Sequence, residues 1–144
     1  MIVFLSPSKT FTNNYVDGSN PLFVDKSDFL INEISMFSKE DLKTKLKLSD
    51  KLVNEVYNYY HSTNNPSQAI FHYGGIVYQG LNPKALNFKD NKLYILSGQY
   101  GLLRSTDMIK KYRIDFNNRM LGSLYNYWTD VVHKYLVDSY KNEI

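Results

Sequence analysis

The 144-residue sequence contains no cysteine, one tryptophan and only three histidines. The absence of cysteine excludes disulfide bonds, thiolate metal sites and a cysteine nucleophile, and it suits a reducing compartment. The histidines lack the spacing of metal ligands, so we predict no protein metal site and no cofactor. Long apolar runs are also missing: none approaches the roughly 18 residues that span a bilayer, and the apolar start lacks the basic residues of a signal peptide. We therefore expect a cytoplasmic protein that does not bind membranes.

What is present is a composition far from that of a disordered chain. Hydrophobic residues make up 43% of the sequence and aromatic residues 15%, including 13 tyrosines and 8 phenylalanines. This length and apolar content predict one domain with a single core. The formal net charge of +3 and the pI near 8.9 permit a phosphate-bearing partner without requiring one.

Two short apolar runs predict strands. Residues 2–5 are all apolar and end at Ser6-Pro7, so we expect a central parallel strand that is covered on both faces. Residues 93–96 form a second run, and Ser97-Gly98 follows it where the chain can turn. Helical patterns lie between and after these runs. The predicted fold class is therefore α/β, with a mixed central β-sheet flanked by helices.

Serine residues mark the predicted helix starts. Ser27, Ser38 and Ser49 each precede an apolar helical pattern and are expected to cap it. Gly122-Ser123 opens the clearest helix, in which Trp128 is expected to anchor the core. Residues 11–26 are expected to form a long loop, residues 82–86 a brief helix, and residues 76–78 either a short strand or the entry to a helix.

The second and third predicted helices join tightly around Lys47-Leu48-Ser49, with Lys51 in the first turn of the second arm. Helical hairpins of this kind hold DNA through backbone N–H groups and neighbouring lysines. However, the glycine of the usual helix-hairpin-helix motif is absent. A solvated lysine face is the alternative interpretation.

The residues after the second strand carry a concentration of functional groups, namely Ser97, Tyr100, Arg104 and Asp107. Because α/β proteins usually place sites on loops at the carboxyl ends of core strands, we expect a flexible polar loop with a functional role. The alternative is structural: Ser97-Gly98 forms a turn, Tyr100 packs, and Arg104 pairs with Asp107 on the surface.

Two other stretches suit an anion. Lys9-Thr10 matches the last pair of the phosphate-binding loop G-x-x-x-x-G-K-[ST], but its glycines are missing, so we expect either a looser anion site or a solvated turn. Between residues 104 and 119, basic side chains are interleaved with Tyr112 and Phe116. That pattern fits phosphate neutralisation with stacking, and it also fits a strand whose aromatic residues face inward.

Six motifs in order resemble the peroxide stress protein YaaA family, also called UPF0246. They are Ser6-Pro7-Ser8-Lys9-Thr10, Leu48-Ser49-Asp50-Lys51-Leu52, Val77-Tyr78-Gln79-Gly80-Leu81, Leu96 to Arg104 with Asp107, Tyr112-Arg113, and Leu124-Tyr125-Asn126-Tyr127-Trp128.

The resemblance implies a cytosolic DNA-binding protein of the hydrogen peroxide stress response. Its mixed α/β fold would hold the nucleic-acid backbone in a basic cleft without reading sequence. The residues expected to contact DNA or phosphate are Lys9, Thr10, Lys51, Ser97, Gly98, Arg104 and Arg113. No catalytic residue is predicted, and the sequence does not specify the oligomeric state.

Family chains continue for a substantial second part, so residues 1–144 are expected to be the N-terminal part of a single, incomplete YaaA-like domain. A shortened chain of this kind is expected to expose one side of its core. Two alternatives to DNA binding are open. One is a nucleotide- or nucleic-acid-processing enzyme, with Lys9 and Arg104 gripping phosphate and Asp107 or Tyr100 transferring protons. The other is an inactive truncated remnant.

Overall fold

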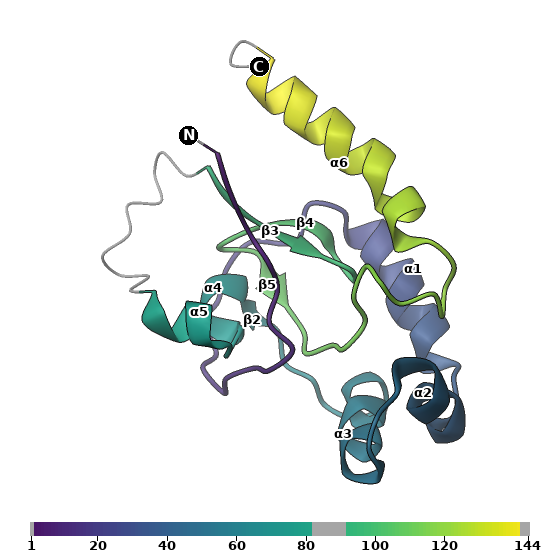
Figure 1. Ribbon diagram of the computed structural model, residues 1–144. Coiled ribbons are helices and arrows are strands. Elements are labelled where there is room, and N and C mark those ends of the chain that lie inside the picture. Colours follow the sequence, from purple (N-terminus) through teal and green to yellow (C-terminus); the bar gives the residue numbers. More distant parts are fainter. Residues whose placement is uncertain (1, 82–91, 142–144) are drawn as a thin grey trace.

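The computed structural model describes residues 2–81 and 92–141, in which helices surround a small mixed sheet (Figure 1). The strands run in the order β1 (Val3–Leu5), β3 (Leu93–Ser97) and β4 (Gly101–Arg104), with β1 parallel and β4 antiparallel to β3. A separate antiparallel pair consists of β2 (Ser67–Gln68) and β5 (Met108–Ile109). The predicted α/β class with a mixed sheet is confirmed.

The described helices are α1 (Val24–Ser35), α2 (Lys39–Leu46), α3 (Asp50–His61), α4 (Ala69–His72), α5 (Ile76–Gly80) and α6 (Leu124–Tyr140). Ser38, Ser49 and Ser123 cap α2, α3 and α6, because each hydroxyl accepts a hydrogen bond from the backbone N–H three residues later. The prediction for Ser27 is wrong: α1 begins earlier, and the buried Ser27 hydroxyl donates to the carbonyl of Val24 at 3.0 Å. A buried serine inside a helix and a capping serine look alike in sequence.

Two segments, residues 76–78 and 82–86, have less regular apolar patterns, and only the first can be compared with the structure. Residues 76–78 begin α5, so the helical alternative is the right one. The brief helix predicted at 82–86 lies outside the described residues. Within the described ranges, we find no helix with the length and apolar character that crossing a membrane requires.

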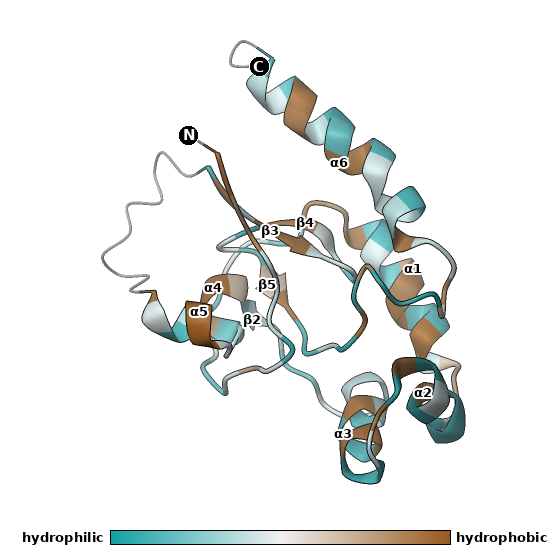
Figure 2. Ribbon diagram, in the orientation of Figure 1, coloured by the Kyte–Doolittle hydropathy of each residue, from teal (hydrophilic) through white to brown (hydrophobic). Residues whose placement is uncertain are grey.

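The prediction that residues 2–5 form a central, fully covered strand is wrong. In the described part of the chain β1 pairs only with β3, so it lies at the edge of the sheet, and Val3 and Phe4 are exposed. Figure 2 shows that β1 is nevertheless hydrophobic along its length. An apolar run indicates that a strand must pack against other elements, but it does not identify those elements.

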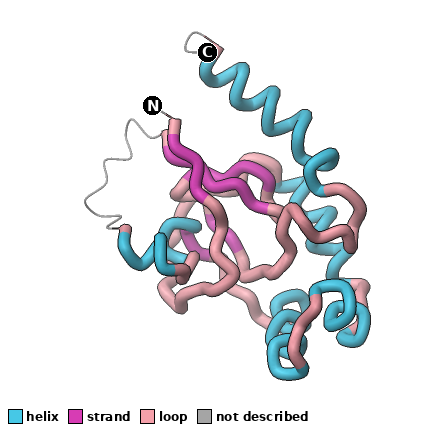
Figure 3. Tube along the Cα trace, viewed as in Figure 1, coloured by secondary structure: helices cyan, strands magenta, loops and turns pink. Residues whose placement is uncertain are grey.

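The flexible loop expected after Ser97 is also wrong. Ser97 pairs with Gly101, and β3 and β4 form a tight hairpin (Figure 3). Leu102 and Leu103 on the second arm are fully buried. The structural alternative, a turn with a packed Tyr100, describes this stretch correctly.

Trp128 of α6 fixes the hairpin in place, and its predicted core position is confirmed by a 1% exposed side chain. Its indole Nε1 donates to the carbonyl of Gly98 at 2.8 Å. Gly101 has φ +76°, and a Cβ there would lie 2.4 Å from the Trp128 ring. Glycine at this turn is therefore required by both conformation and space.

The segment from Lys110 to Phe116 keeps the predicted alternation but is not a strand. Tyr112 and Ile114 are buried, whereas Arg113 between them is partly exposed. The segment crosses the turn of the hairpin, where a Cβ on Gly98 would lie 2.9 Å from the backbone of Asp115. The core therefore orders this segment although it pairs with no strand among the described residues.

Candidate functional site

Hydrogen bonds hold the loop that carries Lys9 in a defined conformation. The Tyr78 hydroxyl donates to the carbonyl of Ser6 at 2.6 Å. The Ser8 hydroxyl accepts from the Thr10 N–H at 3.1 Å and donates to the Thr10 carbonyl at 2.9 Å, which closes a local turn. The Lys9 side chain, 64% exposed, therefore extends into solvent from a defined position.

Lys9 and Arg113 meet at a cavity of about 190 Å³, whose other lining residues are Pro7, Ser8, Tyr112, Ile114 and Asp115. The Lys9 ammonium lies 3.8 Å from one oxygen of Asp115, and both side chains are solvated, so this ion pair is weak. The second Asp115 oxygen accepts hydrogen bonds from the N–H groups of Asn117 and Asn118 at 2.9 and 3.1 Å. The structure thus brings together two of the predicted residues, and Asp115 shapes the turn beside them.

A further contact extends this cationic region toward the helical hairpin. The Asn118 side-chain amide donates to the carbonyl of Lys45 at 3.1 Å, which ties the turn to the last turn of α2. Arg119 follows directly and is exposed, as is Lys45. We call Lys9, Lys45, Arg113 and Arg119 the basic edge. Sequence reasoning missed the part played by Asn118, although the Asp-x-Asn-Asn pattern is a recognisable turn signal.

The α2–α3 hairpin forms where it was predicted. Lys47 adopts the left-handed conformation, φ 55°, at the place where a glycine is usual. Lys51 lies exposed in the first turn of α3, beside the solvated pair of Lys43 and Asp50. No described hydrogen bond or ion pair links Lys51 to the cavity at Lys9. It shares the hairpin with Lys45 and is placed near the basic edge only through that helix pair.

Ser97 and Gly98 lie inside the molecule, behind the basic edge. The Ser97 hydroxyl donates to the Tyr112 hydroxyl at 2.7 Å and accepts from the Tyr100 N–H at 3.1 Å. The Tyr112 hydroxyl also shares a hydrogen bond of 2.6 Å with Tyr73, and burial raises the pKa of both phenols. These groups hold the segment that carries Arg113. Neither Ser97 nor Gly98 lines the cavity at Lys9.

Arg104 lies at the other end of the hairpin. Arg104 pairs with Tyr94, whereas Ser97 beside the turn pairs with Gly101. Three residues separate Tyr94 from Ser97, so Arg104 lies roughly 10 Å from the turn. Its guanidinium is 2.8 Å from the carboxylate of Asp107, which is 0% exposed, and it also donates to the carbonyl of Asn20 at 3.0 Å. The hydrogen bond to Asp107 raises the pKa of Arg104. Arg104 therefore ties the loop around residue 20 to the hairpin and does not join the basic edge.

The groups proposed for acid–base chemistry are engaged in structural contacts. One Asp107 oxygen accepts from the Arg104 N–H at 2.8 Å, and the other accepts from the Ser19 hydroxyl at 2.7 Å as well as from the guanidinium. The Tyr100 hydroxyl accepts from the Lys110 N–H at 2.9 Å, and burial raises the pKa of Tyr100 to about 12. Both groups are buried, and their polar atoms are held by contacts within the fold.

His72 is an unusual group that no sequence signal indicated. It is fully buried beside Phe11 and Tyr15, and neither ring nitrogen has a hydrogen-bond partner among the described residues. Burial, followed by the charge of Lys111, lowers the pKa of His72 to about 4. The imidazole is therefore neutral in the folded protein at pH 7.

Comparison with known proteins adds a family match over the whole chain. The model of a family described as peroxide stress protein YaaA matches residues 1–144. A UPF0246 protein of Finegoldia magna is 35% identical over 144 residues, which cover 94% of this chain and 59% of the relative. A UPF0246 protein of Parabacteroides distasonis is 33% identical, with 90% of this chain and 58% of the relative covered. A UPF0246 protein of Clostridioides difficile is 32% identical, with 95% and 62% covered. The chain thus spans about three fifths of the length of these relatives.

Proposed function

Because this chain belongs to the peroxide stress protein YaaA family, we propose that it acts in the cytoplasm in the response to hydrogen peroxide by binding the sugar-phosphate backbone of DNA. The basic edge is the contact surface, and Thr10 adds a hydroxyl donor beside Lys9. These 144 residues contain no cysteine and therefore offer no thiol with which to sense peroxide, so we place the role in the response to peroxide.

The observation that carries the proposal is the hydrogen bond from Asn118 to the carbonyl of Lys45. It joins two cationic regions that are far apart in the sequence, the Lys9–Arg113 cavity and the lysine-bearing hairpin. A phosphate backbone presents negative charge at regular spacing, so an extended cationic surface can contact several phosphates at once. The contacts carry no base identity, and binding is expected to be independent of sequence.

Lys51 and Arg104 lie outside the basic edge and remain predicted DNA contacts beyond this surface. Lys51 extends it only if the duplex follows the hairpin from α2 to α3. Arg104 has a 39% exposed side chain, which leaves part of the guanidinium available to a phosphate while Asp107 holds the rest. Ser97 and Gly98 support the proposal indirectly, because they position the backbone on either side of Arg113.

The test is the salt dependence of DNA affinity, measured by fluorescence anisotropy with a labelled duplex of mixed sequence between 50 and 300 mM salt, roughly the range in which counterion release dominates. Arg113→Ala is expected to lower the slope of log affinity against log salt by about 0.9, the contribution of one phosphate contact. A second duplex of unrelated sequence is expected to give the same slope.

Lys134→Ala serves as the matched control, since Lys134 is an exposed cation on α6 that pairs with Asp138. It removes the same charge from outside the basic edge and is expected to leave the slope unchanged. The full-length Finegoldia magna relative is measured in parallel. If neither protein binds DNA, or if both substitutions act equally, the proposal is wrong. Binding by the relative alone indicates that this chain is an inactive remnant.

A further inference from the structure

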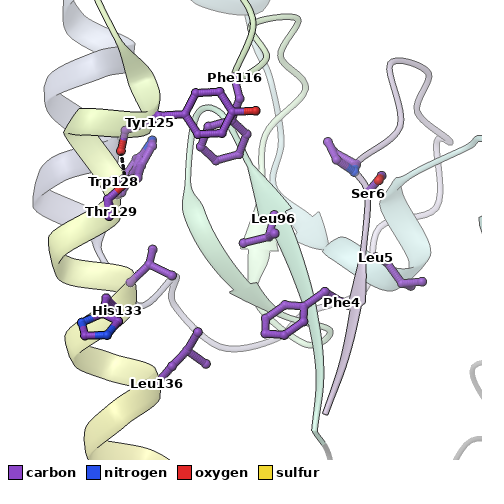
Figure 4. A pocket seen from close by; sticks show the side chains of 12 residues that line it. Phe4, Leu5, Ser6, Leu96, Phe116, Tyr125, Trp128, Thr129, His133 and Leu136 are labelled. Atoms are coloured by element: carbon purple, nitrogen blue, oxygen red, sulfur yellow. Dashed lines mark hydrogen bonds between the residues drawn. The ribbon is translucent and has the colours of Figure 1, made fainter.

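Two cavities of the protein are opposite in character. The larger, about 570 Å³, is an open groove between β1 and α6, lined mainly by apolar and aromatic side chains such as Phe4, Leu96 and Leu136 (Figure 4). No lysine, arginine, aspartate or glutamate of the described ranges lines it. The smaller, about 250 Å³, lies at the end of α3 and is lined by Glu55, Lys111 and several amide and hydroxyl side chains. We call this smaller cavity the α3-end pocket. A charged, hydrogen-bonding ligand finds its partners there.

Helix α3 presents one polar face to the α3-end pocket. Glu55, Asn58, Tyr59 and Ser62 line the pocket with the spacing i, i+3, i+4 and i+7, which places side chains on one side of a helix. The Tyr59 hydroxyl donates to one carboxylate oxygen of Glu55 at 3.1 Å. The second Glu55 oxygen has no partner among the described residues, so it can accept a hydrogen bond from a ligand.

Asn64 fixes the two walls of the pocket relative to each other. Its side-chain amide donates to the carbonyls of Tyr59 and Lys111 at 3.0 and 2.9 Å. Its side-chain oxygen accepts from the Lys111 N–H at 3.0 Å. These three bonds tie the end of α3 to the segment that carries Lys111. The pocket is therefore formed before a ligand enters it.

Four polar side chains at the pocket have no structural task. Within residues 2–81 and 92–141, no side-chain hydrogen bond involves Asn58, Ser62, Thr63 or Asn65, all of which line the pocket. Each amide offers a donor and an acceptor side by side. The hydrogen-bonding edge of a nucleobase presents the complementary pattern.

Tyr15 supplies a flat surface at the same pocket. Its ring packs against the buried His72 with 5.8 Å between ring centroids, and 53% of the residue remains exposed. No described hydrogen bond holds its hydroxyl. Nucleobases stack on exposed aromatic rings of this kind, and the amides beside Tyr15 can bond to the edge of a stacked base.

A second, smaller cavity of about 110 Å³ adjoins the α3-end pocket and shares Tyr59, Ser62, Asn64 and Lys111 with it. Lys110 joins Lys111 in its lining. The Lys111 ammonium donates to the neutral side chain of Asn13 at 3.1 Å, and neither lysine is in an ion pair with a described carboxylate. Two adjacent ammonium groups without acidic partners suit a phosphate group.

We infer that the two adjoining cavities together bind a nucleoside monophosphate whose base carries an amino group. The base stacks on Tyr15 and bonds to the amides of Asn58 and Asn65. The phosphate lies at the ammonium groups of Lys110 and Lys111. None of these residues belongs to the basic edge, so the site is separate from the proposed DNA surface.

Glu55 sets the direction of the ligand. It lines the α3-end pocket and not the adjoining cavity with Lys110. A carboxylate repels a phosphate and accepts hydrogen bonds from the amino group of a base. The base therefore occupies the pocket with Glu55, and the phosphate occupies the cavity with the two lysines.

The experiment is isothermal titration calorimetry of guanosine monophosphate (GMP) into this chain at low ionic strength. One molecule of GMP is expected to bind per chain. Uridine monophosphate, which lacks the amino group, is expected to bind about fivefold more weakly, because it loses a hydrogen bond to Glu55. Guanosine is expected to bind about tenfold more weakly, because it lacks the phosphate that the lysines contact.

Two pairs of variants locate the site. Tyr15→Ala is expected to weaken GMP binding about tenfold through loss of stacking. Tyr125→Ala is its matched control, since Tyr125 on α6 is 56% exposed and lies in the apolar groove. Lys111→Ala is expected to weaken binding about tenfold, whereas Lys134→Ala removes an equal charge from α6 and should have no effect.

Tyr15→Phe distinguishes loss of stacking from loss of folding, because it keeps the ring. It is expected to retain GMP affinity within about twofold. The three histidines provide a second readout by nuclear magnetic resonance. GMP is expected to shift the ring signals of His72, which packs against Tyr15, and to leave those of His133 in the apolar groove unchanged.

Four results overturn the inference. The first is no binding of GMP at millimolar concentration. The second is equal weakening by the pocket variants and their α6 controls. The third is a shift of His133 without a shift of His72, which would place the nucleotide in the apolar groove. The fourth is much tighter binding of a single-stranded trinucleotide than of GMP, which would make the pocket part of a nucleic-acid site. Binding of duplex DNA by the basic edge is tested separately and does not depend on the first three.

Discussion

Arg104 and Arg113 illustrate how differently two arginines of one segment can be used. Both were predicted to line a DNA-binding cleft, and both follow buried aromatic or aliphatic residues. Arg104 faces a fully buried carboxylate, Asp107, at 2.8 Å, so its charge is paired within the fold and only the exposed part of its guanidinium is open to a ligand. Arg113 lines an open cavity with Lys9, and only the solvated Asp115 shares that cavity as a carboxylate. Whether a cation is available to a ligand therefore depends on its neighbours in space.

The largest expected effect tests whether Arg104 stabilises the fold, as its contact with Asp107 indicates. Arg104→Ala leaves the Asp107 charge buried without its partner, and we expect it to lower the free energy of unfolding by about 3 kcal/mol. Urea denaturation followed by circular dichroism measures the change. Arg113→Ala is the comparison variant and is expected to cost less than about 0.5 kcal/mol. Similar losses for the two arginines would contradict the assignment of Arg104 to the fold.

The next effect concerns His72, which lies behind the loop that bears Lys9. In the unfolded chain this histidine binds a proton below about pH 6.5, but in the folded protein its pKa is about 4. The unfolded state thus binds more protons between these values, and stability is expected to fall by about 2 kcal/mol as the pH drops from 6.5 toward 4.

Urea denaturation at a series of pH values measures this loss. His72→Leu is expected to remove it, because leucine does not titrate. His133→Asn replaces an exposed histidine of α6 and should leave it unchanged. A pH dependence that survives His72→Leu would show that other groups are responsible.

Gly98→Ala tests whether the hairpin turn positions Arg113. The added Cβ would lie 2.9 Å from the backbone of Asp115 and 3.0 Å from the carbonyl oxygen of Ile114, so we expect a loss of about 2 kcal/mol in stability. DNA affinity should fall as well, since the segment with Arg113 must shift. Gly80→Ala is the control, because no atom lies within 4 Å of its added Cβ. If Gly98→Ala unfolds at the same urea concentration as the unchanged protein, the close approach is not a constraint.

The smallest expected effect tests whether the cations at the Lys9–Arg113 cavity are available to DNA. Asp115→Asn keeps a side-chain oxygen that can accept from Asn117 and Asn118, but it removes the negative charge beside Lys9. We expect DNA affinity to rise about two- to threefold at 50 mM salt and the gain to disappear at 1 M salt, where screening is strong. Anisotropy titrations measure both. Asp138→Asn on α6 removes an equal charge from the Lys134 pair and should have no such effect.

Local patterns predicted the elements that depend on a few neighbouring residues. The caps predicted at Ser38 and Ser49 and the helix start predicted at Gly122-Ser123 were correct, because a capping hydroxyl bonds to a backbone N–H only three residues away. The strand at 93–96 and the helix with Trp128 were found for the same reason, since their apolar spacing is a local property. Ser27 failed because its environment, the interior under α1, is made by residues far from it in the sequence.

The amino-acid sequence by itself determined the α/β class, the helical hairpin, the exclusion of thiol chemistry and the family. Tertiary structure alone decided that β1 lies at the edge of the sheet in the described part of the chain, beside an open apolar groove, that Arg104 belongs to a half-buried ion pair, and that Asn118 joins the Lys9–Arg113 cavity to α2. The physical reason is that burial and electrostatic pairing depend on distances of a few ångströms between segments that are tens of residues apart. A local pattern specifies which side chains need a partner, and only the folded chain supplies one.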